Sequence, residues 1–193
     1  MAGNARYTAI LDACVLYPAP VADALMSIHV AGLYTARWTR RIEDEWVEAV
    51  LRKRPEIREG LMRRRDAMRT VVPDWEIGAG RYESLMPCLT LPDPKDIHVL
   101  AAAIAGSADC IVTANSRDFP AEVLETHGVE VIHPDDFLVY QLDLDPIPAL
   151  AAFKEMRQRL RKPPLDAEAF ATTLERNSLA ATAQRLREAA DLI

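Results

Sequence analysis

Polar side chains able to bind a cation recur where predicted strands end or where the adjoining helices begin. They are four carboxylates and one amide: Asp12, Glu45, Asp96, Asp118 and Asn115. Asp12 closes a short apolar run at residues 7–11, and Asp118 lies shortly after the strand predicted at 109–114. In parallel α/β sheets, ligands bind at the carboxyl ends of the strands. We therefore expect these side chains to converge if the two strands are neighbours.

Carboxylates in a cluster cannot all stay ionised without a compensating positive charge. Oxygen ligands at strand ends suit Mg²⁺ or Mn²⁺, which keep several waters and bind substrate phosphates. Such an ion generates hydroxide and stabilises charge that develops on a phosphoryl group. The residues therefore predict metal-dependent hydrolysis of a phosphoester.

Each acid also has a purely structural interpretation. An Asp at a strand end often serves as a turn or cap residue, and Asp96 could simply favour the dipole of the helix it begins. Asp93, just before Pro94, is expected to be an N-cap. Glu43 stays an alternative to Glu45. On an α-helix the two side chains point about 200° apart, so only one of them can point at the site. The joint pattern favours the functional interpretation.

Strands and helices are predicted to alternate along most of the chain. Strands are expected at 7–11, 33–36, 109–114 and 129–132. Helices are expected at 21–32, 40–53, 55–70, 94–106, 120–127 and 134–142. Thr39 is the expected N-cap of the helix at 40–53, and Pro94 and Gly106 are expected to open and close the helix at 94–106. This alternation predicts an α/β fold with a parallel sheet and helices on both faces. Residues 149–193 contain no strand candidate, so the predicted domains are an α/β domain at 1–145 and a helical extension at 146–193.

Composition excludes several classes of protein. The chain has 193 residues, of which half are hydrophobic, so it is not intrinsically disordered. No apolar run reaches the ~18 residues of a membrane span. Three cysteines without a C-x-x-C pair indicate free thiols in a reducing compartment, and the N-terminus lacks the pattern of a signal peptide. The predicted location is the cytoplasm.

The net charge of −6 is unevenly distributed. Residues 37–69 hold eleven Arg or Lys against seven acids, whereas residues 70–149 hold three against fourteen. A basic surface beside the acids would attract a phosphate backbone, although a solvated helix face is the alternative. Consecutive arginines at 63–65 favour the first interpretation, since their side chains point in three directions and cannot all pair locally. The candidates for backbone contacts are Arg40, Arg41, Arg63 and Arg64.

Four segments resemble PIN-domain ribonucleases, in particular the toxins of bacterial VapBC toxin–antitoxin systems. They are ILDACVLYP at 10–18, WTRRIEDEW at 38–46, LPDPKDIHVLAAAIAGSADCIVTANSRDFP at 91–120 and VEVIHPDDFL at 129–138. The resemblance covers about residues 6–142. It implies a PIN-like three-layer fold and an endoribonuclease that uses Mg²⁺ or Mn²⁺ and leaves 5′-phosphate and 3′-hydroxyl ends. It also implies an RNA substrate and a cognate antitoxin, and leaves a homodimer open.

Carried over by position, the acidic site of the family falls on four residues: Asp12, Glu45, Asp96 and Asp118. All except Glu45 are expected to hold metal, and Glu45 to complete the site or orient water. Thr113 matches a position whose side chain orients the acids. Asn115 matches a position that holds Asp in many members of the family. Because Asn carries no charge, the site could bind one metal ion instead of two. The family often has Asn or Ser where this chain has Cys14. A packed thiol is expected there, and the alternative is a thiol that faces the site and tunes it. The C-terminal helices resemble the extension of a longer subset of these toxins.

Other functions are compatible with parts of the same pattern. A haloacid-dehalogenase-like phosphatase needs a second Asp two residues after the first, where Cys14 stands. A catalytically silent PIN-fold module that binds RNA or protein is the remaining alternative. The histidines show no zinc-ligand spacing, and His98 is expected to point away from Asp96. The tryptophans are expected to be core or interface residues and not platforms for stacking bases.

Overall fold

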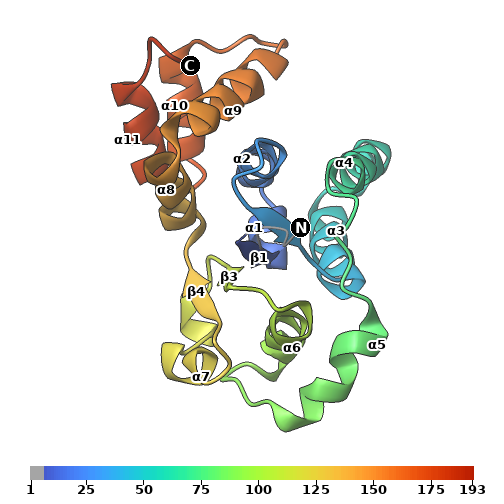
Figure 1. Cartoon of the computed structure of the whole chain (residues 1–193). Helices are drawn as coiled ribbons and strands as arrows, with labels where there is room; N and C mark the ends of the chain where they lie inside the picture. The colour runs from blue at the N-terminus through green and yellow to red at the C-terminus, as the bar shows by residue number, and fades with distance from the viewer. Residues whose placement is uncertain (1–6) are drawn as a thin grey trace. The chain divides into compact units, whose positions relative to one another are not determined.

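The structure, a computed structural model, describes residues 7–193, so the first six residues of the predicted N-terminal domain lie outside the described residues. The described chain divides into two compact units, one made of residues 7–17 and 34–133 and the other of 18–33 and 134–193 (Figure 1). Helix α2 (Ala19–Val30) thus belongs with the C-terminal helices. The domain boundary at residue 145 stays a prediction.

A four-stranded parallel sheet forms the centre of the first unit. In the order β2-β1-β3-β4, its strands are Thr35–Arg37, Thr8–Leu11, Cys110–Val112 and Glu130–Ile132. Strands β1 and β3 are almost wholly buried, as expected of parallel strands covered on both faces. Leu11 pairs with Val112, so the carboxyl ends of these two strands meet at one edge. The predicted fold class, an α/β protein with a parallel sheet flanked by helices, is confirmed.

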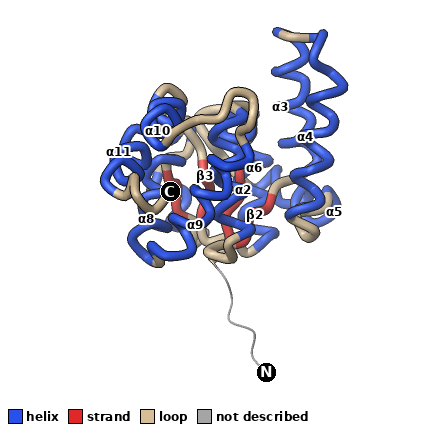
Figure 2. Tube along the Cα trace, turned by 90° about the horizontal axis from the view of Figure 1, so that it is seen from above, coloured by secondary structure: helices blue, strands red, loops and turns tan. Residues whose placement is uncertain are grey.

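The helices of the first unit are α1 (Ala13–Leu16), α3 (Arg40–Lys53), α4 (Arg58–Val71), α5 (Ala79–Tyr82), α6 (Ile97–Gly106) and α7 (Ala121–Glu125). Short 3₁₀ turns at Pro55–Ile57, Glu83–Cys88, Pro94–Asp96 and Ser116–Asp118 connect or precede them. Figure 2 shows α3 and α4 side by side as a hairpin. Thr39 caps α3 as predicted, because its hydroxyl oxygen accepts a hydrogen bond from the Ile42 N–H at 3.1 Å.

The end of α6 differs from the prediction that Gly106 closes the helix. Gly106 is the last helical residue, and Ser107 adopts the left-handed conformation with φ of 50°. A Cβ atom at Gly106 would lie 2.5 Å from Ile77 Cδ1. The glycine therefore allows close packing of Ile77 against the helix, and the turn itself falls on Ser107.

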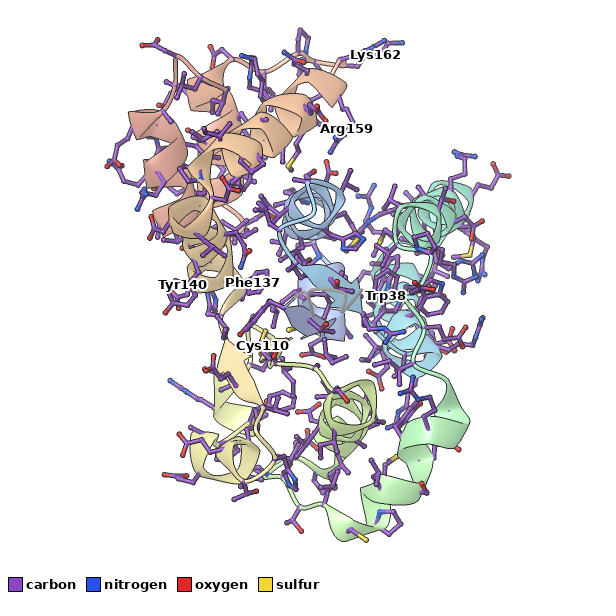
Figure 3. The ribbon with its side chains drawn as sticks, in the orientation of Figure 1. Trp38, Cys110, Phe137, Tyr140, Arg159 and Lys162 are labelled. Carbon is purple, nitrogen blue, oxygen red and sulfur yellow. The ribbon has the colours of Figure 1, made fainter. Side chains whose placement is uncertain are left out.

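The three tryptophans are buried, as predicted. Trp38 and Trp46 are almost completely buried, and Trp75 is nearly so. The rings of Trp38 and Trp75 stack with centroids 5.2 Å apart, and Trp38 is labelled in Figure 3. Their burial leaves these side chains unavailable for stacking on bases.

The second unit is entirely helical within the described chain. With α2 it comprises α8 (Pro134–Leu144), α9 (Pro146–Arg159), α10 (Ala167–Glu175) and α11 (Ala180–Glu188). Leu179 has no side-chain oxygen to cap α11, but the Asp135 carboxylate accepts from the Ala181 and Thr182 N–H groups, both at 2.8 Å. Asp135, on α8, therefore supplies a cap to the last helix.

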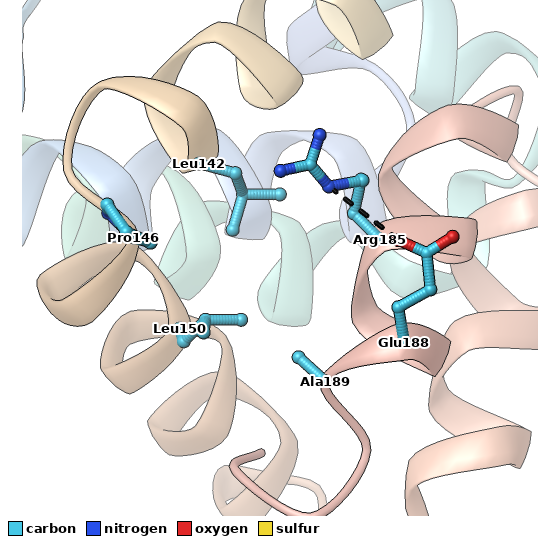
Figure 4. A pocket seen from close by; sticks show the side chains of 6 residues that line it. All are labelled: Leu142, Pro146, Leu150, Arg185, Glu188 and Ala189. Atoms are coloured by element: carbon cyan, nitrogen blue, oxygen red, sulfur yellow. Dashed lines mark ion pairs between the residues drawn. The ribbon is translucent and has the colours of Figure 1, made fainter.

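One pocket of the second unit lies among α8, α9 and α11, with a volume of about 220 Å³ (Figure 4). It is lined by Leu142, Pro146, Leu150, Arg185, Glu188 and Ala189. None of the helices described in residues 7–193 is both long and apolar enough to cross a membrane.

Candidate active site

Asp12 lies at the edge where β1 and β3 end together. Its Oδ1 accepts a hydrogen bond from the Ala13 N–H at 2.6 Å, so it caps α1, and its Oδ2 accepts from the Thr113 hydroxyl at 2.7 Å. Thr113 is fully buried, and its oxygen accepts in turn from the Asn115 N–H at 3.0 Å. Asp12 thus caps α1 with one carboxylate oxygen, while Thr113 orients the other. The role of a helix cap is therefore compatible with a role in binding metal.

Cys14 also contacts Asp12, so it faces the site, which was the alternative to the packed thiol that we expected. Its Sγ lies 3.1 Å from Asp12 Oδ2 and 3.2 Å from Thr113 Oγ1, and it accepts from the Ala114 N–H at 3.2 Å. Burial, followed by the charge of Asp12, raises the pKa of Cys14 to about 12. The neutral thiol therefore donates to the carboxylate. Its position two residues after Asp12 was the signal that sequence reasoning undervalued.

Asp96 is electrostatically linked to the other candidate acids. It ends the 3₁₀ turn that leads into α6, and its side chain is half-buried. Burial raises the pKa of Asp96 to about 6, and the charges of Asp12, Asp93 and Asp118 act in the same direction, against the effect of His98. Asp93 itself caps the turn as predicted, accepting from the Lys95 N–H at 2.9 Å. Three of the predicted acids thus share one neighbourhood.

Glu43 and Glu45, the alternatives on α3, have different partners. The buried carboxylate of Glu43 pairs with Arg69 of α4, whose Nε lies 3.0 Å from Oε2. Glu45 Oε1 lies 3.3 Å from Arg41 Nε and 3.1 Å from Nε2 of His98 on α6. Of these two acids, Glu45 is the one that contacts the helix that Asp96 precedes, within the described residues. The contact between His98 and Glu45 is one that the sequence did not indicate.

The pKa of Glu45 is lowered from its ordinary value. Burial acts in the opposite direction, but the hydrogen bonds and electrostatic attraction of His98 and Arg41 outweigh it. Glu45 is therefore held in its ionised form beside the other acids.

No three His, Cys, Asp or Glu side chains within residues 7–193 are grouped closely enough to hold a metal ion on their own. The donor set nonetheless fits Mg²⁺ or Mn²⁺. Mg²⁺ commonly uses one or two carboxylates, several waters and the phosphates of its substrate, so it does not require a cage of protein ligands. Besides burial, repulsion by the neighbouring carboxylates raises the pKa of Asp96, and a bound cation relieves repulsion of this kind.

The predicted backbone-binding arginines have partners within the protein. Arg40 pairs with Glu76 at 3.4 Å, and Arg41 pairs with Glu45. Both pairs have side chains at least 40% exposed, so they are weak and leave the arginines accessible.

Two of the three arginines at 63–65 have local partners and the third binds residues distant in sequence, as expected of consecutive side chains that cannot all pair locally. Arg63 lies 3.8 Å from Glu59, and Arg65 lies 2.8 Å from Asp66. Arg64 donates to the carbonyl oxygens of Leu16 and Tyr17, and its guanidinium lies 4.8 Å from the centre of the Trp46 ring. The partners of Arg64 are thus uncharged backbone carbonyls at the end of α1, which a comparison of acidic and basic residues does not reveal.

Comparisons with known proteins match two parts of the chain. A family model described as "PIN domain" matches residues 8–117, and one described as "VapC50 C-terminal domain" matches residues 134–188. "Putative ribonuclease VapC50" of Mycobacterium tuberculosis (strain ATCC 25618 / H37Rv) is 52% identical over 50 residues, which is 26% of this chain and 30% of that protein. The aligned stretch thus spans less than a third of the relative. No solved structure matches the chain.

Proposed function

The chain belongs to the PIN-domain family and carries a C-terminal domain of the VapC50 type, and from this we propose that it is a metal-dependent endoribonuclease that acts as the toxin of a toxin–antitoxin pair. The observation that carries the proposal is the electrostatic coupling of Asp12, Asp96 and Asp118. Asp12 is oriented by Thr113 at the edge of the sheet, and its charge acts on Asp96 together with that of Asp118.

The side chains have distinct roles in this proposal. Asp12, Asp96 and Asp118 would hold Mg²⁺ or Mn²⁺, which supplies a Lewis acid and an acidified water when bound. Thr113 and Cys14 each donate a hydrogen bond to Asp12 Oδ2 and so fix its orientation. Asn115 fixes Thr113 through its backbone N–H, which leaves the hydroxyl hydrogen for Asp12. Glu45 orients the attacking water and accepts its proton.

The RNA backbone would approach along the α3–α4 hairpin. Residues 52–65 hold seven basic and two acidic side chains. Arg52, Lys53 and Arg58 are exposed, and no ion pair involves any of them within the described chain. Arg52 follows Glu45 by seven residues, which on a helix is about 10 Å and about 20° away, on the same face. These residues are better candidates for phosphate contacts than Arg64, whose guanidinium is occupied.

Neutralising two of these charges should weaken RNA binding. We expect Arg52→Gln with Lys53→Gln to raise KM for RNA about fivefold to tenfold, to leave kcat within about twofold, and to reduce the slope of log K against log salt by about 1.4. Arg161→Gln with Lys162→Gln is the matched control, because it neutralises the charges of an exposed Arg-Lys pair in the second unit. An equal loss in both double variants would contradict a role for the hairpin.

Metal affinity should depend on pH through Asp96. A proton on this carboxyl competes with the cation, and the pKa of Asp96 is raised to about 6. We therefore expect calorimetry to show similar Mn²⁺ affinity at pH values well above 6 and up to about tenfold weaker binding per pH unit below it. Asp93→Asn removes one neighbouring charge and should move this transition to lower pH. Constant affinity from pH 5 to pH 8 would exclude Asp96 as a ligand.

The proposed activity is tested by incubating the purified chain with end-labelled RNA. We expect internal cleavage with Mg²⁺ or Mn²⁺, products with 5′-phosphate and 3′-hydroxyl ends, and no cleavage after EDTA. Cleavage that survives EDTA would overturn the metal mechanism, whereas RNA binding without cleavage would identify a silent module. Growth inhibition on expression, relieved by a co-expressed antitoxin, would test the toxin role.

A further inference from the structure

His98 joins α6 to α3 next to the candidate active site. It lies in the first turn of α6, only two residues after Asp96, and is almost completely buried. Its Nε2 lies 3.1 Å from Glu45 Oε1. No hydrogen bond from the described residues reaches the other carboxylate oxygen of Glu45, so Oε2 is left for a water or another group.

The two nitrogens of His98 differ in their surroundings. Nδ1 is buried and has no hydrogen-bond partner among the described residues. Burying a polar atom in this way carries a desolvation cost that an apolar side chain would avoid. The next residues of α6, Val99, Leu100 and Ala101, are apolar and fully buried, so the environment itself favours an apolar residue. Among residues 7–193, the polar contact that accounts for an imidazole here is that of Nε2 with Glu45.

The second partner of Glu45 is a weaker anchor. Arg41 Nε lies 3.3 Å from Oε1, and the Arg41 side chain is 43% exposed. Exposed pairs of this kind are worth little, because water and salt compete with them and a long side chain must be ordered. The imidazole is held by the packing of α6, so it restricts Glu45 more strongly than Arg41 does.

We propose that His98 is a positioning residue that, through Nε2–H, holds the carboxylate of Glu45 in the orientation that the proposed cleavage requires. This inference rests on the proposed nuclease function. An N–H on Nε2 donates this hydrogen bond to the Glu45 carboxylate. Since His98 acts through Glu45, its removal should matter only while Glu45 is present.

A double-mutant cycle tests this dependence. His98→Leu removes the donor at similar volume, His98→Gln retains an N–H donor, and both are combined with Glu45→Gln. We expect His98→Leu to lower kcat about tenfold with KM for RNA within about twofold, and His98→Gln to recover at least a third of the wild-type kcat. In the Glu45→Gln background, His98→Leu should change kcat less than twofold.

Thermal melting of the same proteins without metal provides a readout independent of activity. The change in Tm caused by His98→Leu should differ between the wild-type and Glu45→Gln backgrounds, because the contact between an imidazole and a carboxylate exists in only one of them. Additive effects on kcat, or a His98→Gln variant as slow as His98→Leu, would overturn the positioning role.

The experiment also distinguishes a folding defect of His98→Leu from a failure of the proposed function. If His98→Leu does not fold, His98→Gln and His98→Asn serve instead, since the shorter Asn amide cannot reach Glu45. An inactive wild-type protein would refute the proposed function itself, whereas an active one with additive effects would refute only this inference.

Discussion

Asp12→Asn is expected to lower the rate of RNA cleavage at least about 10³-fold while the protein remains folded. Asp12 is the acid at the centre of the site, since it is nearly buried, accepts from Thr113 and Cys14, and acts on the charge of Asp96. Losing a charged ligand removes several kcal/mol of transition-state stabilisation, and each 1.36 kcal/mol is about tenfold in rate. Single-turnover cleavage of labelled RNA measures the effect.

Asp93→Asn is the matched control for this substitution. Asp93 lies three residues before Asp96 and caps the 3₁₀ turn through the Lys95 N–H. Asn caps helices about as well as Asp, so the variant should fold normally and cleave RNA within about threefold of wild type. Equal losses in Asp12→Asn and Asp93→Asn would show that general negative charge matters here and that Asp12 has no specific role.

Glu43→Gln should destabilise the protein, whereas Glu45→Gln should mainly reduce its activity. The Glu43 carboxylate is buried against Arg69, whose side chain is 25% exposed and also lies over the Trp75 ring. Removing one partner of a buried pair leaves the other charge uncompensated, at a cost of about 2–4 kcal/mol for this partly exposed arginine. For a chain of this size that cost corresponds to a fall in Tm of roughly 5–15 °C.

Glu45→Gln should change Tm by less than about 3 °C, because its side chain is 40% exposed, but should reduce kcat by about 10²-fold. Melting curves and cleavage rates on the two single variants separate the two roles. The assignment fails if Glu43→Gln loses activity at full stability, or if Glu45→Gln unfolds the protein and leaves the specific activity of its folded fraction unchanged.

The sheet and most helices could be predicted because their signals are local. Apolar runs bounded by turns marked β1 and β3, and Thr39 and Pro94 marked helix starts. Once β1 and β3 are parallel neighbours, Asp12 and Thr113 must meet at the same edge. The apolar pattern alone did not show that these two strands are neighbours. The resemblance to PIN-domain proteins implied it.

Partners on other elements could not be predicted. Helical periodicity places Glu43 and Glu45 on different faces of α3, but only the position of α4 assigns Arg69 to one of them and only α6 assigns His98 to the other. The carbonyl partners of Arg64 are likewise distant in sequence. The grouping of α2 with helices more than a hundred residues later is a tertiary contact with no local signal.

Titration of the metal-free protein with Mn²⁺ by calorimetry tests most directly whether these acids form a metal site. We expect the wild-type protein and Asp93→Asn to release or absorb heat with a saturable profile at a pH above 7, and Asp12→Asn to show no such binding. The absence of Mn²⁺-linked heat in the wild-type protein, or equal heat in Asp12→Asn, would contradict the account.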